Sequence, residues 1–188
     1  MMIHLLRHGM TNANEKRLYC GFADQPLSHK GMEQLRQLKT EISFPKAERY
    51  VTSGLKRAVE TLRILYDKTP DAVIEELNEY NFGDFEMKNH DELKENPDYL
   101  RWIEGGEDVS CPNGESRKKF RERIGHGFRL VREMNVDRIL VVCHGGVIAS
   151  LMNTLFANRK NCYDEWLPQN GRGYSIEISG SAMSCKPL

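Results

Sequence analysis

The sequence lacks the charge imbalance and the long apolar runs that mark several classes of protein. Its 188 residues include 27 Lys and Arg against 27 Asp and Glu, so the formal net charge is zero. Such a chain has no bulk attraction for nucleic acid or an anionic membrane, and neither partner is expected. No apolar run approaches the roughly 20 residues of a membrane span. Residues 1–6 are too short for the apolar core of a signal peptide.

Cysteine is scarce, and its spacing is irregular. There are five cysteines, with no C-x-x-C pair among Cys20, Cys111, Cys143, Cys162 and Cys185. An odd, scattered set argues against a disulfide framework or a zinc site and predicts free thiols in a reducing compartment. We therefore expect a cytoplasmic protein. The length fits one domain over residues 1–188.

Short apolar segments alternate with helical patterns along the chain. Buried strands are predicted at residues 3–6, 49–52, 72–76 and 138–144, and an alternating strand, suited to a sheet edge, at 174–178. Helices are predicted after the N-cap candidates Ser28 and Ser53, from Asn96-Pro97, over 115–134 and over 146–157. This alternation predicts an α/β layered domain with a largely parallel sheet. An acidic stretch at 75–108 interrupts it. We expect an insertion at about 80–112 to cover the active site.

Two predicted strands end in the same way. "HLLRHG" at 4–9 and "LVVCHGG" at 140–146 each place a histidine and then glycine at a strand exit. If the strands are neighbours, His8 and His144 face one crevice at the carboxyl edge of the sheet, where ligands bind in such folds. One such ending alone is more often structural, but two alike favour function. The helix after Gly145 adds N–H groups suited to an anion.

Two arginines strengthen the case for an anion. Arg7 carries a fork of donors that suits phosphate oxygens. Arg57 lies in the first turn of a predicted helix, where a cation opposes the helix dipole unless an anion offsets it. The alternative is a solvated Arg57 that pairs with Glu60 or Asp67.

Glu79, in "LNEYNFGDFE" (77–86), follows the third predicted strand. A carboxylate beside an anion is useful only if it carries a proton or holds the arginines. The competing carboxylates nearby are Glu75, Glu76, Asp84 and Glu86. Two histidines, two arginines and an acid suit phosphoryl transfer without a metal. A histidine–glutamate metal site is the alternative, which the flanking arginines disfavour.

The ordered motifs resemble the histidine phosphatase superfamily, in its phosphoglycerate-mutase-like branch. They are "LLRHGMTNAN", "PLSHKGMEQ", "SGLKRAVET", "LNEYNFGDFE", "PNGES" (112–116) and "VVCHGG". The resemblance covers nearly the whole chain, and the order of the motifs is more specific than any one of them. It implies a three-layer α/β/α sandwich with a mainly parallel sheet.

The resemblance also implies a role for each matching residue. His8 matches the nucleophile that becomes phosphohistidine, and Glu79 matches the acid that protonates the leaving oxygen. The matching phosphate- or substrate-binding residues are Arg7, Thr11, Asn14, Arg57, His144 and Gly145. His144 is expected to be protonated, and the other N–H of His8 to donate to a backbone carbonyl such as that of Gly9. No metal and no cofactor are implied.

The short insertion resembles phosphatases more than mutases of the superfamily. Among the phosphatases, residues 18–31 and 82–93 resemble the α-ribazole phosphatases, which remove a 5′-phosphate during cobalamin assembly. The alternatives are a broad-specificity phosphatase, a cofactor-dependent phosphoglycerate mutase and a non-catalytic binder of phosphorylated ligands. The expected partner is a small phosphate ester, and a homodimer is an assembly that the sequence allows.

A few positions depart from the family pattern or remain open. Met10 stands where relatives carry Glu or Gln, and Met87 where many carry Gly. Tyr80, Phe82 and Phe85 offer an aromatic wall for a substrate, but we expect them to form core beneath the insertion. The remaining histidines are expected to be structural or exposed, namely His4, His29, His90 and His126.

Overall fold

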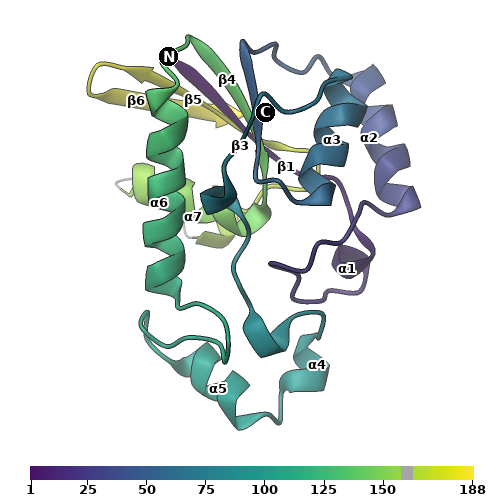
Figure 1. Cartoon of the computed structure of the whole chain (residues 1–188), viewed down its shortest axis with the longest axis vertical. Coiled ribbons are helices and arrows are strands. Elements are labelled where there is room, and N and C mark those ends of the chain that lie inside the picture. The colour runs from purple at the N-terminus through teal and green to yellow at the C-terminus, as the bar shows by residue number, and fades with distance from the viewer. Residues whose placement is uncertain (158–162) are drawn as a thin grey trace.

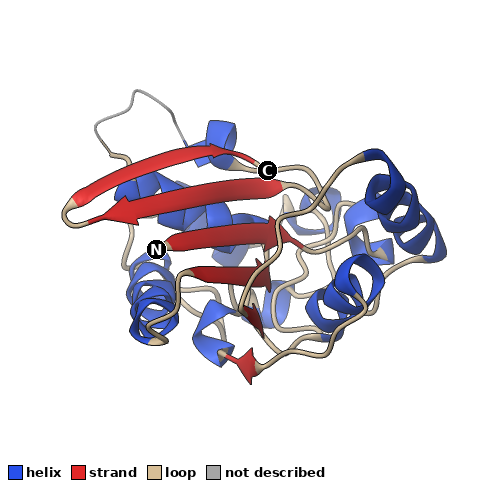
Figure 2. Ribbon diagram, turned by 90° about the horizontal axis from the view of Figure 1, so that it is seen from above, coloured by secondary structure: helices blue, strands red, loops and turns tan. Residues whose placement is uncertain are grey.

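Six strands form one mixed sheet in the order β3-β2-β4-β1-β5-β6 (Figure 2). The computed structural model describes residues 1–157 and 163–188, so Cys162 lies outside the described part. The parallel strands are β1 (Met2–Arg7), β2 (Arg49–Thr52), β3 (Ala72–Val73) and β4 (Arg138–Cys143). β5 (Gly173–Ser179) runs antiparallel to β1 and forms a hairpin with β6 (Ala182–Pro187). The predicted, largely parallel sheet is confirmed.

Helices cover both faces of this sheet. α2 (His29–Glu41) and α3 (Lys56–Tyr66) lie on one face, and α6 (Arg117–Glu133) and α7 (Gly145–Leu155) lie on the other (Figure 1). Alternation along β1 divides the core, because successive side chains of a strand point to opposite faces. Leu5 belongs to the core cluster that contains Ile124 of α6, whereas Leu6 belongs to the cluster that contains Leu35 of α2 and Leu62 of α3. The three-layer sandwich is confirmed.

Several helix ends follow the expected capping chemistry. Ser28 accepts the N–H of Gly31 at 3.1 Å and begins α2. Asn96 caps α5 (Pro97–Glu104), with proline at its first position. A hydroxyl or amide oxygen satisfies N–H groups that have no partner within the helix, which explains why the chain turns into a helix at these points. Within the described residues, no helix combines the length and apolar character needed to cross a bilayer.

Two strand predictions are wrong in detail. The third strand stops at Val73, and Glu75–Leu77 forms the short 3₁₀ helix η1 instead of continuing to residue 76. The strand predicted for an edge is β5, which lies between β1 and β6. β6 is the edge strand, and its mostly exposed side chains left no apolar pattern to predict it from.

The segment between η1 and α6 forms a lobe beyond the sheet (Figure 1). It contains the 3₁₀ helix η2 (Gly83–Phe85), α4 (His90–Leu93) and α5. Phe85, Leu93 and Tyr99 are buried inside it. The lobe therefore has apolar packing of its own, which joins the core on the α6 and α7 face of the sheet.

Candidate active site

The two His-Gly strand ends lie side by side. β1 and β4 are neighbours in parallel register, with Arg7 opposite Cys143. The backbone N–H of His8 donates to the carbonyl of Cys143 at 3.0 Å. The rings of His8 and His144 are 5.2 Å apart between centroids, at an interplanar angle of 63°. The two histidines lie together at the carboxyl edge of the sheet as expected, although neither is among the residues that line the pocket next to Arg7 and Glu79.

The His8 ring is held so that one nitrogen is unprotonated. Nδ1 lies 2.6 Å from the carbonyl oxygen of Gly9. Because a carbonyl oxygen only accepts, Nδ1 carries the hydrogen and Nε2 keeps its lone pair. Burial, followed by the charge of Arg57, lowers the pKa of His8 well below its usual value. His8 is thus a neutral imidazole with Nε2 available.

His144 is also neutral, which differs from the expected cation. Its Nδ1 accepts from Nε of Arg57 at 3.3 Å, so the hydrogen sits on Nε2, which donates to Oγ of Ser53 at 2.8 Å. Burial first, and then the charge of Arg57, lowers the pKa of His144 well below its usual value. Ser53 was expected to cap α3, but that helix begins after Leu55, which makes no side-chain cap.

Arg7 presents a buried donor without a protein partner. Its Nη1 donates to the carbonyl of Pro168 at 2.7 Å. Its Nε is buried and has no hydrogen-bond partner among the described residues. A Cβ at Gly145 would lie 3.0 Å from this Nε, so the glycine allows helix α7 to begin against the guanidinium. An anion at this point would satisfy a donor whose burial is otherwise costly.

Arg57 is buried and is not a solvated side chain. Only 1% of it is exposed. Its Nη2 donates to the carbonyl of Gly21 at 2.6 Å, and its Nη1 donates to that of Ala23 at 2.9 Å. The alternative pairing with Glu60 or Asp67 is wrong, because Glu60 accepts from a backbone N–H and Asp67 pairs with a lysine of α2.

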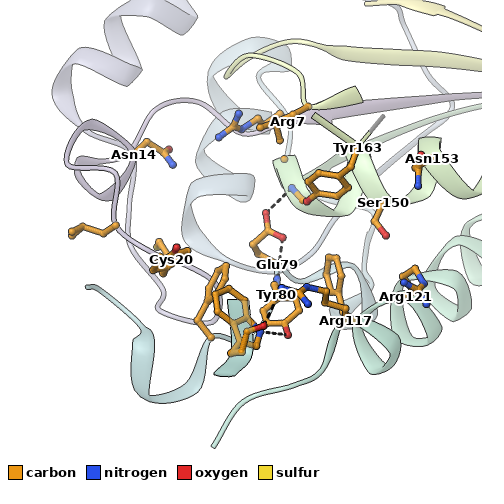
Figure 3. A pocket seen from close by; sticks show the side chains of 18 residues that line it. Arg7, Asn14, Cys20, Glu79, Tyr80, Arg117, Arg121, Ser150, Asn153 and Tyr163 are labelled. Carbon is orange, nitrogen blue, oxygen red and sulfur yellow. Dashed lines mark hydrogen bonds between the residues drawn. The ribbon is translucent and has the colours of Figure 1, made fainter. Parts of the chain in front are cut away.

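Glu79 is the one candidate carboxylate that lines the pocket (Figure 3). Its Oε1 accepts the N–H of Tyr80 at 3.0 Å, and its Oε2 accepts the N–H of Gly146 at 2.9 Å. By contrast, the Glu86 carboxylate accepts the backbone N–H groups of Gly21, Phe22, Ala23 and Phe82. Glu86 therefore holds the loop after helix α1 (Asn12–Glu15) against the 79–86 segment and does not face the pocket.

The first loop places an amide at the pocket, although Thr11 itself does not reach it. Thr11 is fully buried and caps α1 (Asn12–Glu15), where it forms a capping box with Asn14. Oδ1 of Asn14 accepts from the backbone and hydroxyl of Thr11, each at 3.1 Å, so its NH₂ group remains for the pocket. Asn170 donates to the carbonyl of His8 at 3.0 Å, a contact that no sequence motif indicated. Met10 does not line this pocket, and nothing in the structure explains its departure.

The pocket has a volume of about 710 Å³ and two chemically different ends. Arg7, Asn14 and Glu79 line one end (Figure 3). Tyr80 lies away from Arg7 and packs in an aromatic group of pocket-lining residues, namely Tyr19, Phe82, Trp102 and Phe120. Tyr80 and Phe85 are buried in the core as expected, and Tyr80 and the half-buried Phe82 also line the pocket.

A three-layer α/β sandwich that gathers two histidines and two arginines at its strand ends has the arrangement of a phosphate-handling enzyme. The sequence model of the histidine phosphatase superfamily (branch 1) matches residues 3–187. The adenosylcobalamin/α-ribazole phosphatase of Salmonella typhimurium is 34% identical over 160 residues, which cover 82% of this chain and 79% of that protein.

Two further relatives carry different names, one of a mutase and one of a phosphatase. The 2,3-bisphosphoglycerate-dependent phosphoglycerate mutase of Parvibaculum lavamentivorans is 32% identical over 169 residues, with 82% of this chain and 79% of that protein covered. The crystal structure of the α-ribazole phosphatase from Shigella flexneri superposes with a TM-score of 0.88 at 30% identity, covering 100% of this chain and 96% of that chain. The chain belongs to branch 1 of the histidine phosphatase superfamily. It is a phosphatase of that family.

Proposed function

We propose that the protein is a metal-independent phosphomonoesterase that acts through a phosphohistidine. The observation that carries the proposal is the state of His8: a neutral ring, tethered through Nδ1 to Gly9, with Nε2 unoccupied. An unprotonated nitrogen is what a nucleophile requires. The unpartnered Nε of Arg7 supports a phosphoryl group beside it.

The reaction would proceed in two displacements. Nε2 of His8 attacks phosphorus, the ester P–O bond breaks, and Glu79 gives its proton to the leaving oxygen. Glu79 then takes a proton from a water molecule, whose oxygen attacks the phosphohistidine and breaks the P–N bond. Arg7, Arg57 and His144 would hold the phosphoryl oxygens, and a proton taken up by His144 would balance the charge of the bound phosphate.

We propose an ester with a flat, apolar group as the substrate, with α-ribazole 5′-phosphate as the first candidate. The names of the relatives from Salmonella typhimurium and Shigella flexneri support this choice. The aromatic group around Tyr80 supports it independently, because ring faces favour stacking with another ring. A phosphate at Arg7 would leave this wall for the rest of the molecule.

Phosphate release in the presence of EDTA tests the activity. The panel contains α-ribazole 5′-phosphate, p-nitrophenyl phosphate, an alkyl phosphate of similar size without a ring, and 3-phosphoglycerate. We expect release from the esters, with the lowest KM for the ring-containing substrate. Isomerisation of phosphoglycerate in the presence of a bisphosphorylated primer, without phosphate release, would instead favour the mutase activity named for the Parvibaculum relative.

The nucleophile is tested by a matched pair of histidine variants. His8→Ala should abolish turnover and the acid-labile, base-stable phosphoenzyme that a rapid quench traps on the parent. His29→Ala is the control, because that side chain is 82% exposed. Undiminished turnover in His8→Ala would refute the phosphohistidine.

A further inference from the structure

Glu79 lies in a segment that has neither helical nor strand hydrogen bonding. Residues 78–82 separate η1 from η2 and belong to no regular element. A side chain on such a segment keeps its position only if other groups hold its backbone. Glu79, Tyr80 and Phe82 of this segment line the pocket. The position of the segment's backbone therefore decides where the carboxylate of Glu79 lies.

Arg123 of α6 holds this segment with its whole guanidinium. Nη1 donates to the carbonyls of Glu76 and Asn78, each at 2.8 Å, and Nη2 donates to the carbonyl of Glu79 at 3.1 Å. Nε and Nη2 donate to the carboxylate of Glu115 at 3.2 and 2.6 Å. These five contacts use the five N–H donors of an arginine, so no donor is spare.

Glu115 completes the clamp from the other side. It is the glutamate of the "PNGES" motif and is 9% exposed. Its Oε1 accepts the N–H of Asn81 at 2.7 Å, and its backbone carbonyl accepts the hydroxyl of Tyr80. The residues on both sides of Glu79 are thereby fixed to one ion pair. None of the residues of the "PNGES" motif lines the pocket. The contacts of Glu115 with Arg123 and Asn81 therefore offer a structural role for the motif.

We propose that Arg123 and Glu115 are positioning residues that set the carboxyl group of Glu79 for proton transfer. The inference rests on the proposed role of Glu79 as the acid. A neighbouring pair provides a contrast: Arg121 of the same helix also forms an ion pair, with Glu107, but 39% and 60% of their side chains are exposed. Arg123 and Glu115 are 21% and 11% exposed and contact the backbone that carries Glu79.

The test compares leaving groups. An alkyl phosphate needs protonation of its leaving oxygen, whereas p-nitrophenyl phosphate needs little. Lysine keeps the charge at 123 but has three donors and no planar fork, so Arg123→Lys should lower kcat for the alkyl phosphate about 10-fold or more and for p-nitrophenyl phosphate less than about 3-fold. KM should change little, because the phosphate-binding groups are untouched. The control is Arg132→Lys, an exposed arginine of the same helix.

A double-mutant cycle with Glu79→Gln decides whether the effect passes through Glu79. Adding Arg123→Lys to Glu79→Gln should cause no further loss for the alkyl phosphate. Glu115→Gln repeats the test if Arg123→Lys does not fold, because the amide oxygen can still accept the N–H of Asn81. Equal losses on both substrates for these variants, or an additive loss in the Glu79→Gln background, would overturn the inference alone. Equal losses for Glu79→Gln itself would overturn the acid assignment and the inference with it.

Discussion

A methyl group at Gly146 should displace the carboxylate of Glu79 while leaving the fold intact. A Cβ built at Gly146 lies 2.4 Å from Oε1 and 3.1 Å from Cδ of Glu79, whereas ordinary contacts begin near 3.4 Å. Gly146→Ala therefore requires Glu79 to move by about 1 Å, the difference between 3.4 and 2.4 Å. A shift of this size in a catalytic group costs about 10²-fold in rate.

The stability cost of the same change is small. It weakens the hydrogen bond from the N–H of Gly146 to the carboxylate of Glu79, which at 2.9 Å contributes about 1.5–3 kcal/mol. Alanine is favoured over glycine in a helix by up to about 1 kcal/mol, which offsets part of this loss. The net change of about 0.5–2 kcal/mol lowers Tm by a few degrees and leaves the protein folded at 25 °C.

The assay is kcat for an alkyl phosphate, with Tm measured on the same samples. Gly125→Ala is the matched control, because it adds a methyl within helix α6, where the nearest neighbouring atom is 4.0 Å away. The control should keep full activity and gain stability. If Gly146→Ala retained the parental kcat for the alkyl phosphate, a Glu79 acid held against the start of α7 would be refuted.

Three further predictions concern the loop clamp, a strained position and pH. Glu86 binds the backbone N–H groups of the loop at Gly21 and Ala23, and a carbonyl of that loop accepts from Arg57. Glu86→Gln should therefore displace Arg57 and weaken inhibition by orthophosphate about 10-fold. An unchanged inhibition constant would contradict this role of Glu86. Met87 has a φ of 59°, so Met87→Gly should raise the free energy of unfolding by about 0.5–1 kcal/mol, measured by urea denaturation. Burial lowers the pKa of three histidines in the folded state, namely His4, His8 and His144. The unfolded chain then binds more protons below about pH 6.5, so stability should be constant above that pH and fall below it by up to about 1.4 kcal/mol per pH unit for each histidine. If the free energy of unfolding of His4→Asn fell with pH as steeply as that of the parent, the contribution assigned to His4 would be refuted.

The sequence predicted the strands of the sheet that are apolar and that end in a histidine followed by glycine. β1 and β4 are short buried runs, and parallel strands must leave the sheet at the same edge, which brings His8 and His144 together. β6 was not predictable, because an edge strand with exposed side chains needs no apolar alternation. Ser53 fits an N-cap by local chemistry, but its partner is a histidine 91 residues away.

The sequence by itself indicated the family, the layered α/β fold and a set of candidate site residues. Only the tertiary structure decided their states and positions. The pKa of His144 is lowered because folding removes water from its ring and places the charge of Arg57 beside it, and the backbone carbonyl of Glu79 accepts from Arg123, which lies 44 residues further along the chain. Proton affinity and side-chain direction depend on the neighbours that folding supplies, and local sequence does not contain those neighbours.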